Sequence, residues 1–253
     1  MLLVTSGPGA TNAVTPLADA LMDSIPLVCI TGQVPTALIG SDAFQECDTS
    51  GVTRPCTKHN YLVKTVEALV PTVREAFHVA AKGRPGPVVI SLPEDMLYEE
   101  ASSAIPARVS ITRPAPAIDA ITTARSMLEG AERPMVIAGG SVWDDGSIAD
   151  LSRFAASFGV PVACSFRRQR LMNNLDPHYA GDLGLGCNPA LLERIRGSDC
   201  LILLGGRLSE IPAQSRINAS LSGIWRKASL LKIMSNDPSS KGRGPGLTVR
   251  KLH

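Results

Sequence analysis

The segment LLVTSGPGATN, residues 2–12, decides the fold of the first part of the chain. Residues 2–5 are apolar and partly β-branched, as in a buried strand, and they run directly into Ser-Gly-Pro-Gly. A helix is predicted over 11–23, where apolar residues recur at helical spacing. A strand that ends in glycine before a helix leaves backbone N–H groups at the carboxyl edge of an α/β sheet, where ligands bind. Gly-Pro-Gly is also common in plain turns that need a positive φ, so both interpretations stay open here.

The same alternation continues through the first hundred residues. Apolar runs predict strands at 26–31 (PLVCIT) and 88–92, and helical spacing predicts a helix over 66–81 that the run GRPGP ends. Between 31 and 66 few apolar positions are periodic, which predicts a long loop. Because compact domains seldom keep such a loop without using it, we expect a site there.

Four side chains of this loop are candidates for the site: Phe44, Gln45, Lys58 and His59. The residues themselves leave a plain alternative for each. Phe44 also suits a core anchor, and Lys58 and His59 suit ordinary surface positions.

A second α/β unit follows a proline-rich stretch. Residues 103–118 carry three prolines without a clear period, as in a semi-rigid linker, and Asp119 is a candidate N-cap for a helix over 121–130. Strands are predicted at 134–138, 160–165 and 200–204, and helices at 148–158 and 189–195. The sequence thus predicts two doubly wound α/β domains with mainly parallel sheets, over 1–102 and 119–235, with 103–118 as linker and 236–253 as an irregular basic tail.

Composition excludes several classes of protein. Of 253 residues, 44% are hydrophobic and 19% charged, and 25 basic against 23 acidic residues leave a net charge of +2. This balance argues against a nucleic-acid or membrane-surface partner. The six cysteines form no CxxC pair, so we expect no zinc site and a reducing cytoplasm. The first residues lack a signal-peptide pattern, and no run of about 18 apolar residues is present to span a bilayer.

Five motifs in a fixed order carry a family resemblance. TSGPGATN, LADALMDSIPLVCITGQVP, IGSDAFQE, TRPCTKHNYLV and GRPGPVVISLPEDM cover 5–96 almost continuously and resemble the acetolactate synthase catalytic subunit, a thiamine-diphosphate-dependent enzyme. They correspond to the later part of the family's pyrimidine-binding domain. The second unit is similar to the central domain, which holds FAD in that family, although SFRRQRLMNNLDPHYAGDLGLGCNP (165–189) looks more like other thiamine-diphosphate-dependent relatives.

The resemblance implies a reaction. Thiamine diphosphate supplies a carbanion at C2 of its thiazolium ring, which attacks pyruvate, and after loss of carbon dioxide the remaining carbanion adds to a second 2-oxo acid. By resemblance, Gln45 lies at the reacting centre, where its amide contacts the cofactor and donates to a developing oxyanion. Phe44 and Pro35 are implied to line the substrate channel, and Lys58 a neighbouring wall.

The resemblance also implies an FAD site, in a role that is usually structural. Its matching positions are Ser24, Arg84, Gly139, Ser165, Phe166, Leu183, Gly184, Gly205, Gly206 and Arg207. The pairs Gly139-Gly140 and Gly205-Gly206 follow predicted strands, where a missing Cβ allows backbone to approach phosphate, and the arginines suit phosphate oxygens. A plain left-handed turn at each strand end is the alternative for the glycines.

Two features of the family are not in this sequence. The activating glutamate lies upstream of TSGPGATN in the family, and here no glutamate precedes Glu46. The GDG signature that binds Mg²⁺ and the diphosphate does not occur after residue 207, and 230–242 only faintly resembles the close of the central domain. We therefore expect this chain to be catalytically incomplete.

Other functions stay open on the sequence. Glyoxylate carboligase or another thiamine-diphosphate-dependent carboligase or decarboxylase is an alternative within the same superfamily. An alternative of another class is a non-catalytic nucleotide-binding or interaction module that keeps the central fold without turnover. The family implies 2-oxo acid substrates, a homo-oligomer with a site shared between chains, and a regulatory subunit.

Overall fold

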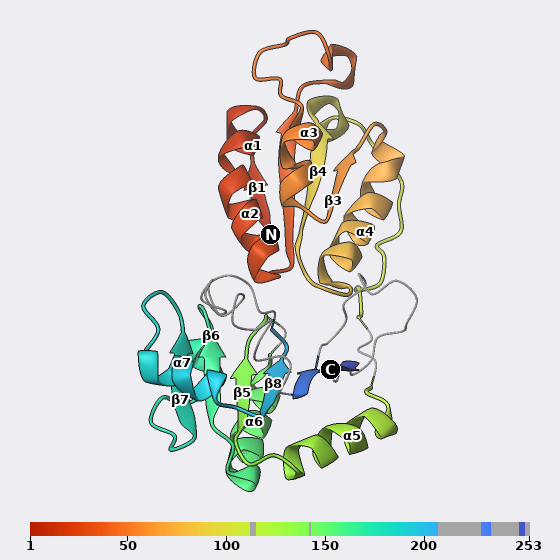
Figure 1. The fold of residues 1–253 in the computed structure, drawn as a ribbon. Coiled ribbons are helices and arrows are strands. Elements are labelled where there is room, and N and C mark those ends of the chain that lie inside the picture. Colours follow the sequence, from red (N-terminus) through yellow and green to blue (C-terminus); the bar gives the residue numbers. More distant parts are fainter. Residues whose placement is uncertain (112–114, 142, 207–228, 234–247, 251–253) are drawn as a thin grey trace. The chain divides into compact units, whose positions relative to one another are not determined.

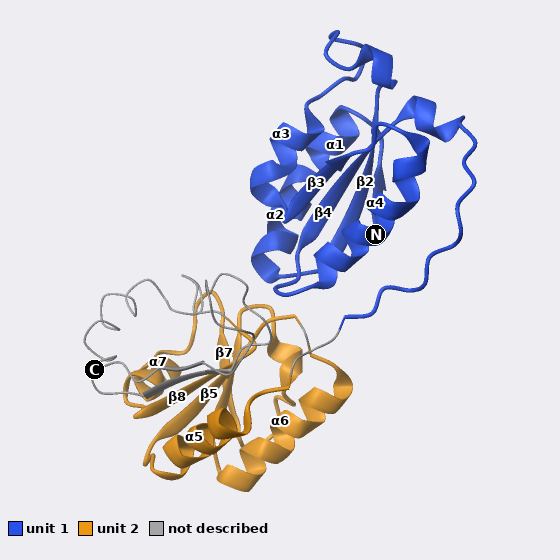
Figure 2. Ribbon diagram, turned by 90° about the vertical axis from the view of Figure 1, so that its right-hand side faces the viewer, with its two compact units in different colours: residues 1–112 blue, residues 113–253 orange. Residues whose placement is uncertain are grey.

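The chain forms two compact units, residues 1–112 and 113–253, in the computed structural model (Figure 2). The structure describes all residues except 112–114, 142, 207–228, 234–247 and 251–253. The division between the units falls inside the proline-rich stretch 103–118. Each unit has its own sheet and its own hydrophobic core.

The first unit is a four-stranded parallel sheet with helices on both faces (Figure 1). Its strands lie in the order β1-β2-β4-β3. The strands and α-helices are β1 (Leu2–Val4), α1 (Pro8–Asn12), α2 (Val14–Asp23), β2 (Leu27–Gln33), α3 (Thr49–Thr53), β3 (His59–Leu62), α4 (Leu69–Ala81) and β4 (Pro87–Pro93). Short 3₁₀ turns lie at Thr36–Leu38, Arg54–Cys56, Val66–Ala68 and Glu94–Leu97.

Alternate residues of the central strands face opposite helices, as the pleat of a strand requires. Val28 of β2 belongs to the same buried cluster as Ala76 of α4. Its neighbour Cys29 packs in the cluster of Leu17 of α2, on the other face. A strand that is apolar on both sides is therefore covered on both sides, which explains the unbroken run PLVCIT.

The second unit is a six-stranded sheet in the order β10-β9-β8-β5-β6-β7. All its strand pairs are parallel except the pair of β10 with β9, which is antiparallel. Its strands and α-helices are α5 (Ile118–Glu129), β5 (Pro134–Ala138), α6 (Asp145–Phe158), β6 (Val162–Ser165), β7 (Tyr179–Leu183), α7 (Pro189–Arg196), β8 (Cys200–Leu204), β9 (Ser229–Ile233) and β10 (Thr248–Arg250), with a 3₁₀ turn at Gln169–Leu171.

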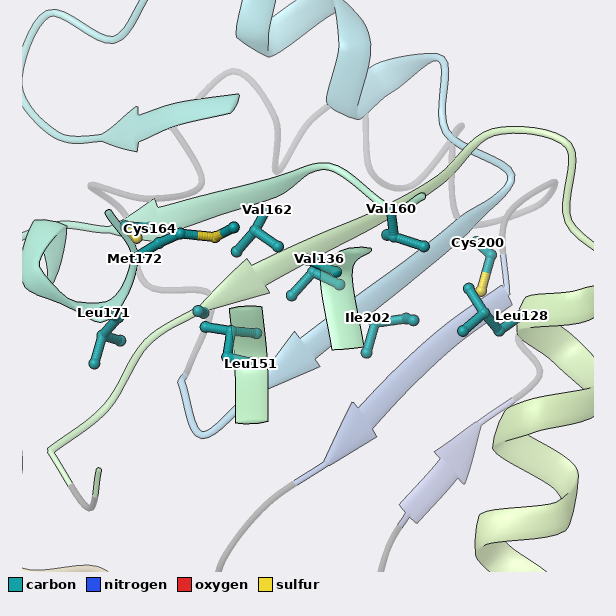
Figure 3. Close-up of a cluster of buried hydrophobic side chains, with 12 residues drawn as sticks. Leu128, Val136, Leu151, Val160, Val162, Cys164, Leu171, Met172, Cys200 and Ile202 are labelled. Carbon is teal, nitrogen blue, oxygen red and sulfur yellow. The ribbon is translucent and has the colours of Figure 1, made fainter. Parts of the chain in front are cut away.

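Two buried clusters sandwich this sheet. On one face Val136 and Ile202 pack with Leu128 of α5 and Leu151 of α6 (Figure 3). On the other face Met135 and its neighbours pack against α7. Both units are therefore doubly wound and mainly parallel, so the predicted fold class is confirmed. No helix in the described parts of the chain has the length and apolarity needed to cross a bilayer.

Several local predictions were wrong. The segment 31–66 is not one long loop, because it contains α3 and the edge strand β3. The helix expected over 11–23 is two helices that meet at Ala13. Asp119 is not an N-cap: α5 begins at Ile118 after Ala117, and the aspartate lies in the first turn of the helix. Inside the tail expected at 236–253 the structure describes β10.

All six cysteines are free thiols. Cys29, Cys164 and Cys200 are buried in strands of the two sheets. Burial raises the pKa of Cys29 and of Cys164 to about 11, since the thiolate is poorly solvated there.

Candidate functional site

At the carboxyl edge of the first sheet, the turn after β1 lies against the loop that carries Phe44 and Gln45. Gly7 has a φ of +46°, and a Cβ on it would lie 2.4 Å from the carbonyl oxygen of Gln45. Only glycine fits this approach, so the Gly-Pro-Gly turn is required by its contact with the loop. Phe44, Gln45 and Pro35, which follows the end of β2, therefore share one edge of the sheet.

The loop is fixed by hydrogen bonds to its own backbone and to β2. The Glu46 carboxylate accepts from the N–H groups of Gly40 and Ala43, and these bonds lower the pKa of Glu46. Gln33, a buried residue at the end of β2, donates from Nε2 to the carbonyl of Cys47 at 3.0 Å. Gln33 was missed by the sequence analysis, although a glutamine directly after an apolar strand is a signal for a buried anchor.

Gln45 itself has an uncommon backbone conformation. Its φ is +63°, which a non-glycine residue adopts rarely and at some cost in free energy. The side chain of Phe44 next to it is 89% exposed. An exposed aromatic ring beside a strained glutamine suits contact with a ligand better than it suits a core anchor.

Two buried hydroxyls lie in the central strands of the same sheet. Thr31 of β2 and Ser91 of β4 are partners in the parallel register, and both are almost fully buried. Among the described residues neither hydroxyl oxygen has a hydrogen-bond partner. A buried polar group without a partner costs roughly 1–3 kcal/mol of stability.

Thr31→Val is therefore expected to stabilise the first unit by roughly 1–2 kcal/mol, because valine has nearly the same shape and no hydroxyl to desolvate. Thr53→Val is the matched control: its equally buried hydroxyl donates to the Thr49 carbonyl at 2.6 Å and accepts from Asn60 at 2.7 Å. The control is expected to lose roughly 1–3 kcal/mol. Urea unfolding compares the two, and equal destabilisation would mean that Thr31 has a bound partner such as an internal water.

Lys58 lies at the opposite, amino edge of the sheet, where β3 begins. Its ammonium donates to the carbonyls of Val79 and Lys82, at 2.5 and 2.7 Å, at the end of α4. Burial, and then the charge of Arg84, lower the pKa of Lys58. His59, the first residue of β3, packs its ring against Tyr61 with centroids 4.4 Å apart. Within this unit both side chains therefore have structural contacts far along the strands from Gln45.

Arg84 and Ser24 also lie at the amino edge. The guanidinium Nε of Arg84 donates to the Ser24 hydroxyl at 2.8 Å, and its Nη2 donates to the carbonyl of Leu21 at the end of α2. Ser24 ends this helix in the left-handed conformation, with a φ of +59°. The structure thus brings these two residues together, and apart from the glutamine loop.

Two hollows of the first unit, of about 830 and 840 Å³, run along α4 and the extended stretch 103–111. Arg74 and Val70 line both of them, and neither is lined by Gln45 or Lys58.

In the second unit the strand order itself marks a binding edge. Counted from β5, the strands lie in the order 3-2-1-4-5-6, which is the order of dinucleotide-binding sheets. The connections leave in opposite directions from β5 and β8, and ligands bind in the crevice at the carboxyl ends of such a pair. In this count β5 is the first strand, β6 the second, β7 the third and β8 the fourth.

The two glycine pairs meet at this reversal point. A Cβ on Gly139 would lie 3.2 Å from the Cα of Gly206, and a Cβ on Gly140 would lie 1.9 Å from the carbonyl oxygen of Gly205. The Gly139 N–H donates to the Leu204 carbonyl at 2.9 Å. The glycines are thus required by the contact between the two strand-end turns.

Four further candidates lie at the same edge. Ser165 ends β6 next to Gly139, and its Oγ would be 2.8 Å from a Cβ there. A Cβ on Gly184, directly after the buried Leu183 of β7, would lie 3.7 Å from the ring of Phe166. Ser165 therefore lies beside the first glycine pair, and Gly184 and Phe166 lie beside each other at the same edge of the sheet. Arg207 lies outside the described residues.

Comparison with known proteins identifies both units. Residues 1–52 match the family described as thiamine pyrophosphate enzyme, N-terminal TPP binding domain, and residues 121–243 match thiamine pyrophosphate enzyme, central domain. The chain is 45% identical to the acetolactate synthase isozyme 3 large subunit of Escherichia coli, over 95% of the chain and 42% of that protein.

Other relatives carry the same name. Identity is 36% to an acetolactate synthase of Mycobacterium bovis, over 95% of the chain and 39% of that protein. It is 38% to the mitochondrial acetolactate synthase catalytic subunit of Saccharomyces cerevisiae, over 83% of the chain and 32% of that protein. The chain thus spans about two fifths or less of the length of these relatives. It belongs to the thiamine pyrophosphate enzymes, with their N-terminal and central domains, and is homologous to acetolactate synthase large subunits.

Proposed function

We propose that this chain supplies the pyrimidine-binding and central parts of an enzyme that condenses 2-oxo acids with thiamine diphosphate, as an acetolactate synthase does. The observation that carries the proposal is the strained Gln45, held against the Gly7 turn at the carboxyl edge of the first sheet. Family membership supplies the cofactor class, and this edge is where an α/β sheet binds its ligand.

Thiamine diphosphate, when bound, supplies the carbanion that attacks the 2-oxo group. The residues of this chain orient the reacting groups and exclude water from the site. The Gln45 amide donates a hydrogen bond to oxygen that becomes negative as the substrate reacts, which favours the transition state. Phe44 gives the site an apolar wall, and Gln33 with Glu46 hold the loop in place through the contacts described above.

Three carboxylates near this edge make structural hydrogen bonds. The Glu46 carboxylate accepts from the backbone of its own loop. Asp48 caps α3 by accepting from the Gly51 N–H at 2.9 Å, and Asp95 accepts from the Thr36 N–H. The described residues also contain no group of three His, Cys, Asp or Glu side chains placed to hold a metal ion. We therefore propose that the complete enzyme draws its activating acid and its Mg²⁺ ligands from residues that are not in this sequence.

We infer that the central unit binds FAD or a related adenine nucleotide. The dinucleotide-type strand order supports this, as does the position of Ser165, Phe166 and Gly184 at the carboxyl edge of the same sheet. Ser24 and Arg84 belong to this proposal only through the family resemblance, and Lys58 belongs to the substrate site only in the same way. All three make structural contacts at the amino edge of the first unit's sheet. We place the enzyme in a reducing cytoplasm, since its cysteines are free, and propose a homo-oligomer with a regulatory subunit.

A chimeric enzyme tests the proposed reaction. Residues 1–206 replace the matching part of the Escherichia coli isozyme 3 large subunit, which is 45% identical, and acetolactate formation from pyruvate is measured. We expect activity, and we expect Gln45→Ala to lower kcat by roughly 100-fold, the usual effect of losing one oxyanion donor. Arg153→Ala, an exposed change on α6, is the control for folding and expression. An active chimera in which Gln45→Ala changes nothing would refute the role given to Gln45.

A further inference from the structure

Residues 40–46 (GSDAFQE) form a turn in which the last side chain holds the first residue. One oxygen of the Glu46 carboxylate accepts from the N–H of Gly40, and the other accepts from the N–H of Ala43 at 3.0 Å. The N–H of Glu46 donates in turn to the Ala43 carbonyl at 2.9 Å. A single carboxylate therefore fixes both the start and the middle of this 40–46 turn.

The hydrogen bonds to Glu46 favour its charged form. The N–H of Gly40 and then that of Ala43 contribute most to lowering the pKa of the Glu46 carboxyl, and those of Ser41 and Asp42 lower it further. Successive backbone N–H groups that converge on one anion form a concave donor site of the kind that binds free anions in other proteins. Hydrogen bonds to a charged acceptor are stronger than neutral ones, so Glu46 is a firm anchor for the turn.

The turn holds two residues in an unfavourable backbone conformation. The φ angle is +57° at Asp42 and +63° at Gln45, and neither residue is glycine. For a residue with a side chain, the left-handed region is disfavoured by an amount that corresponds to roughly tenfold in population. Such strain persists where the surrounding contacts impose it. At Gln45 these contacts are the Gly7 turn, against which its carbonyl lies, and the Glu46 carboxylate that closes the turn.

We propose that Glu46 is a positioning residue for the reaction, and that its carboxylate holds Gln45 in the left-handed conformation that presents the Gln45 amide to the substrate. The inference rests on the proposed function and deepens it. Without the carboxylate, Gln45 relaxes to a conformer with negative φ, which an unconstrained backbone prefers roughly tenfold. The competent conformer then makes up about a tenth of the molecules, and kcat falls by the same factor.

The active chimera described above measures this effect. Glu46→Ala is expected to lower kcat roughly tenfold and to leave the KM for pyruvate unchanged, because the Gln45 amide acts in the transition state. Asp48→Ala is the matched control, since this carboxylate also accepts from a backbone N–H, that of Gly51 at 2.9 Å, but caps α3. The control is expected to lower stability and to keep kcat within about twofold, because it acts on the helix and not on Gln45.

A double variant separates positioning from a general loss of stability. If Glu46 acts through Gln45, its removal costs nothing further once the amide is gone, so Gln45→Ala/Glu46→Ala is expected to have the kcat of Gln45→Ala. A carboxylate that only stabilises the fold would lower kcat by the same factor in both backgrounds. Equal losses in the two backgrounds, an unchanged kcat in Glu46→Ala, or a loss in Asp48→Ala as large as that in Glu46→Ala would each overturn the proposal.

Hydrogen exchange of the full 253-residue chain tests the conformational step without any activity. Followed by NMR, exchange of the Gly40 and Ala43 amides is expected to be roughly tenfold faster or more in Glu46→Ala, because their acceptor is gone. Asp48→Ala is expected to leave both amides unchanged. Unchanged exchange in Glu46→Ala would overturn the inference alone. An inactive chimera would overturn the proposed function and, with it, the role of Glu46 in the reaction, so the two failures are distinguishable.

Discussion

Gly140→Ala is expected to destabilise the second unit severely. Gly140 has a φ of +81°, and a Cβ there would lie 1.9 Å from the carbonyl oxygen and 2.8 Å from the carbonyl carbon of Gly205. Both atoms are backbone at the end of the neighbouring central strand, so relief requires β5 and β8 to separate. Overpacking and left-handed strain together cost roughly 4 kcal/mol or more, a large part of the 5–15 kcal/mol that usually stabilises a domain.

Gly159→Ala separates the two causes of this loss. Gly159 ends α6 with a φ of +61°, and no atom lies within 4 Å of its added Cβ. This control suffers the backbone strain alone, so it is expected to cost about 1–2 kcal/mol. Urea unfolding followed by circular dichroism measures both variants. If Gly140→Ala unfolds within about 1 kcal/mol of Gly159→Ala, the contact between the glycine pairs is not what requires glycine there.

The 253-residue chain by itself is expected to form no acetolactate from pyruvate when supplied with thiamine diphosphate and Mg²⁺. Activation of the cofactor needs a carboxyl group that exchanges a proton, and the family's activating glutamate precedes TSGPGATN, whereas no glutamate precedes Glu46 here. Glu46 itself, Asp48 and Asp95 accept hydrogen bonds from backbone N–H groups. The colorimetric acetoin assay measures the product, with the active chimera as positive control. Turnover by the chain that disappears in Gln45→Ala would show that the chain is self-sufficient.

Much of the fold was predictable because the central strands are apolar on both faces. The strands at Pro134–Ala138 and Cys200–Leu204 were predicted to the residue, since each is a short apolar run between turn signals. β3 and β7 were missed for the opposite reason. They lie at the edges of their sheets, so His59, Asn60 and Asp182 are tolerated in them and the apolar pattern is lost.

The missed strand also explains the placement of the candidate site. With β3 unrecognised, Gln45 and Lys58 belonged to one apparent loop, and nothing in the sequence separated them. The strand begins directly after Lys58, which sets this residue at the amino edge, whereas Gln45 precedes α3 and contacts the turn after β1. Motif order gives the residues of a site, but the edge on which each one lies depends on strand direction.

The buried thiols give each unit its own reporter of local opening. Alkylating reagents attack the thiolate, which is scarce at neutral pH when burial raises the pKa of Cys29 and Cys164 to about 11. Each cysteine becomes reactive only when its own strand is exposed, β2 in one unit and β6 in the other. Labelling rates in the native state therefore measure the opening free energies of the two units separately, in one sample and without denaturant.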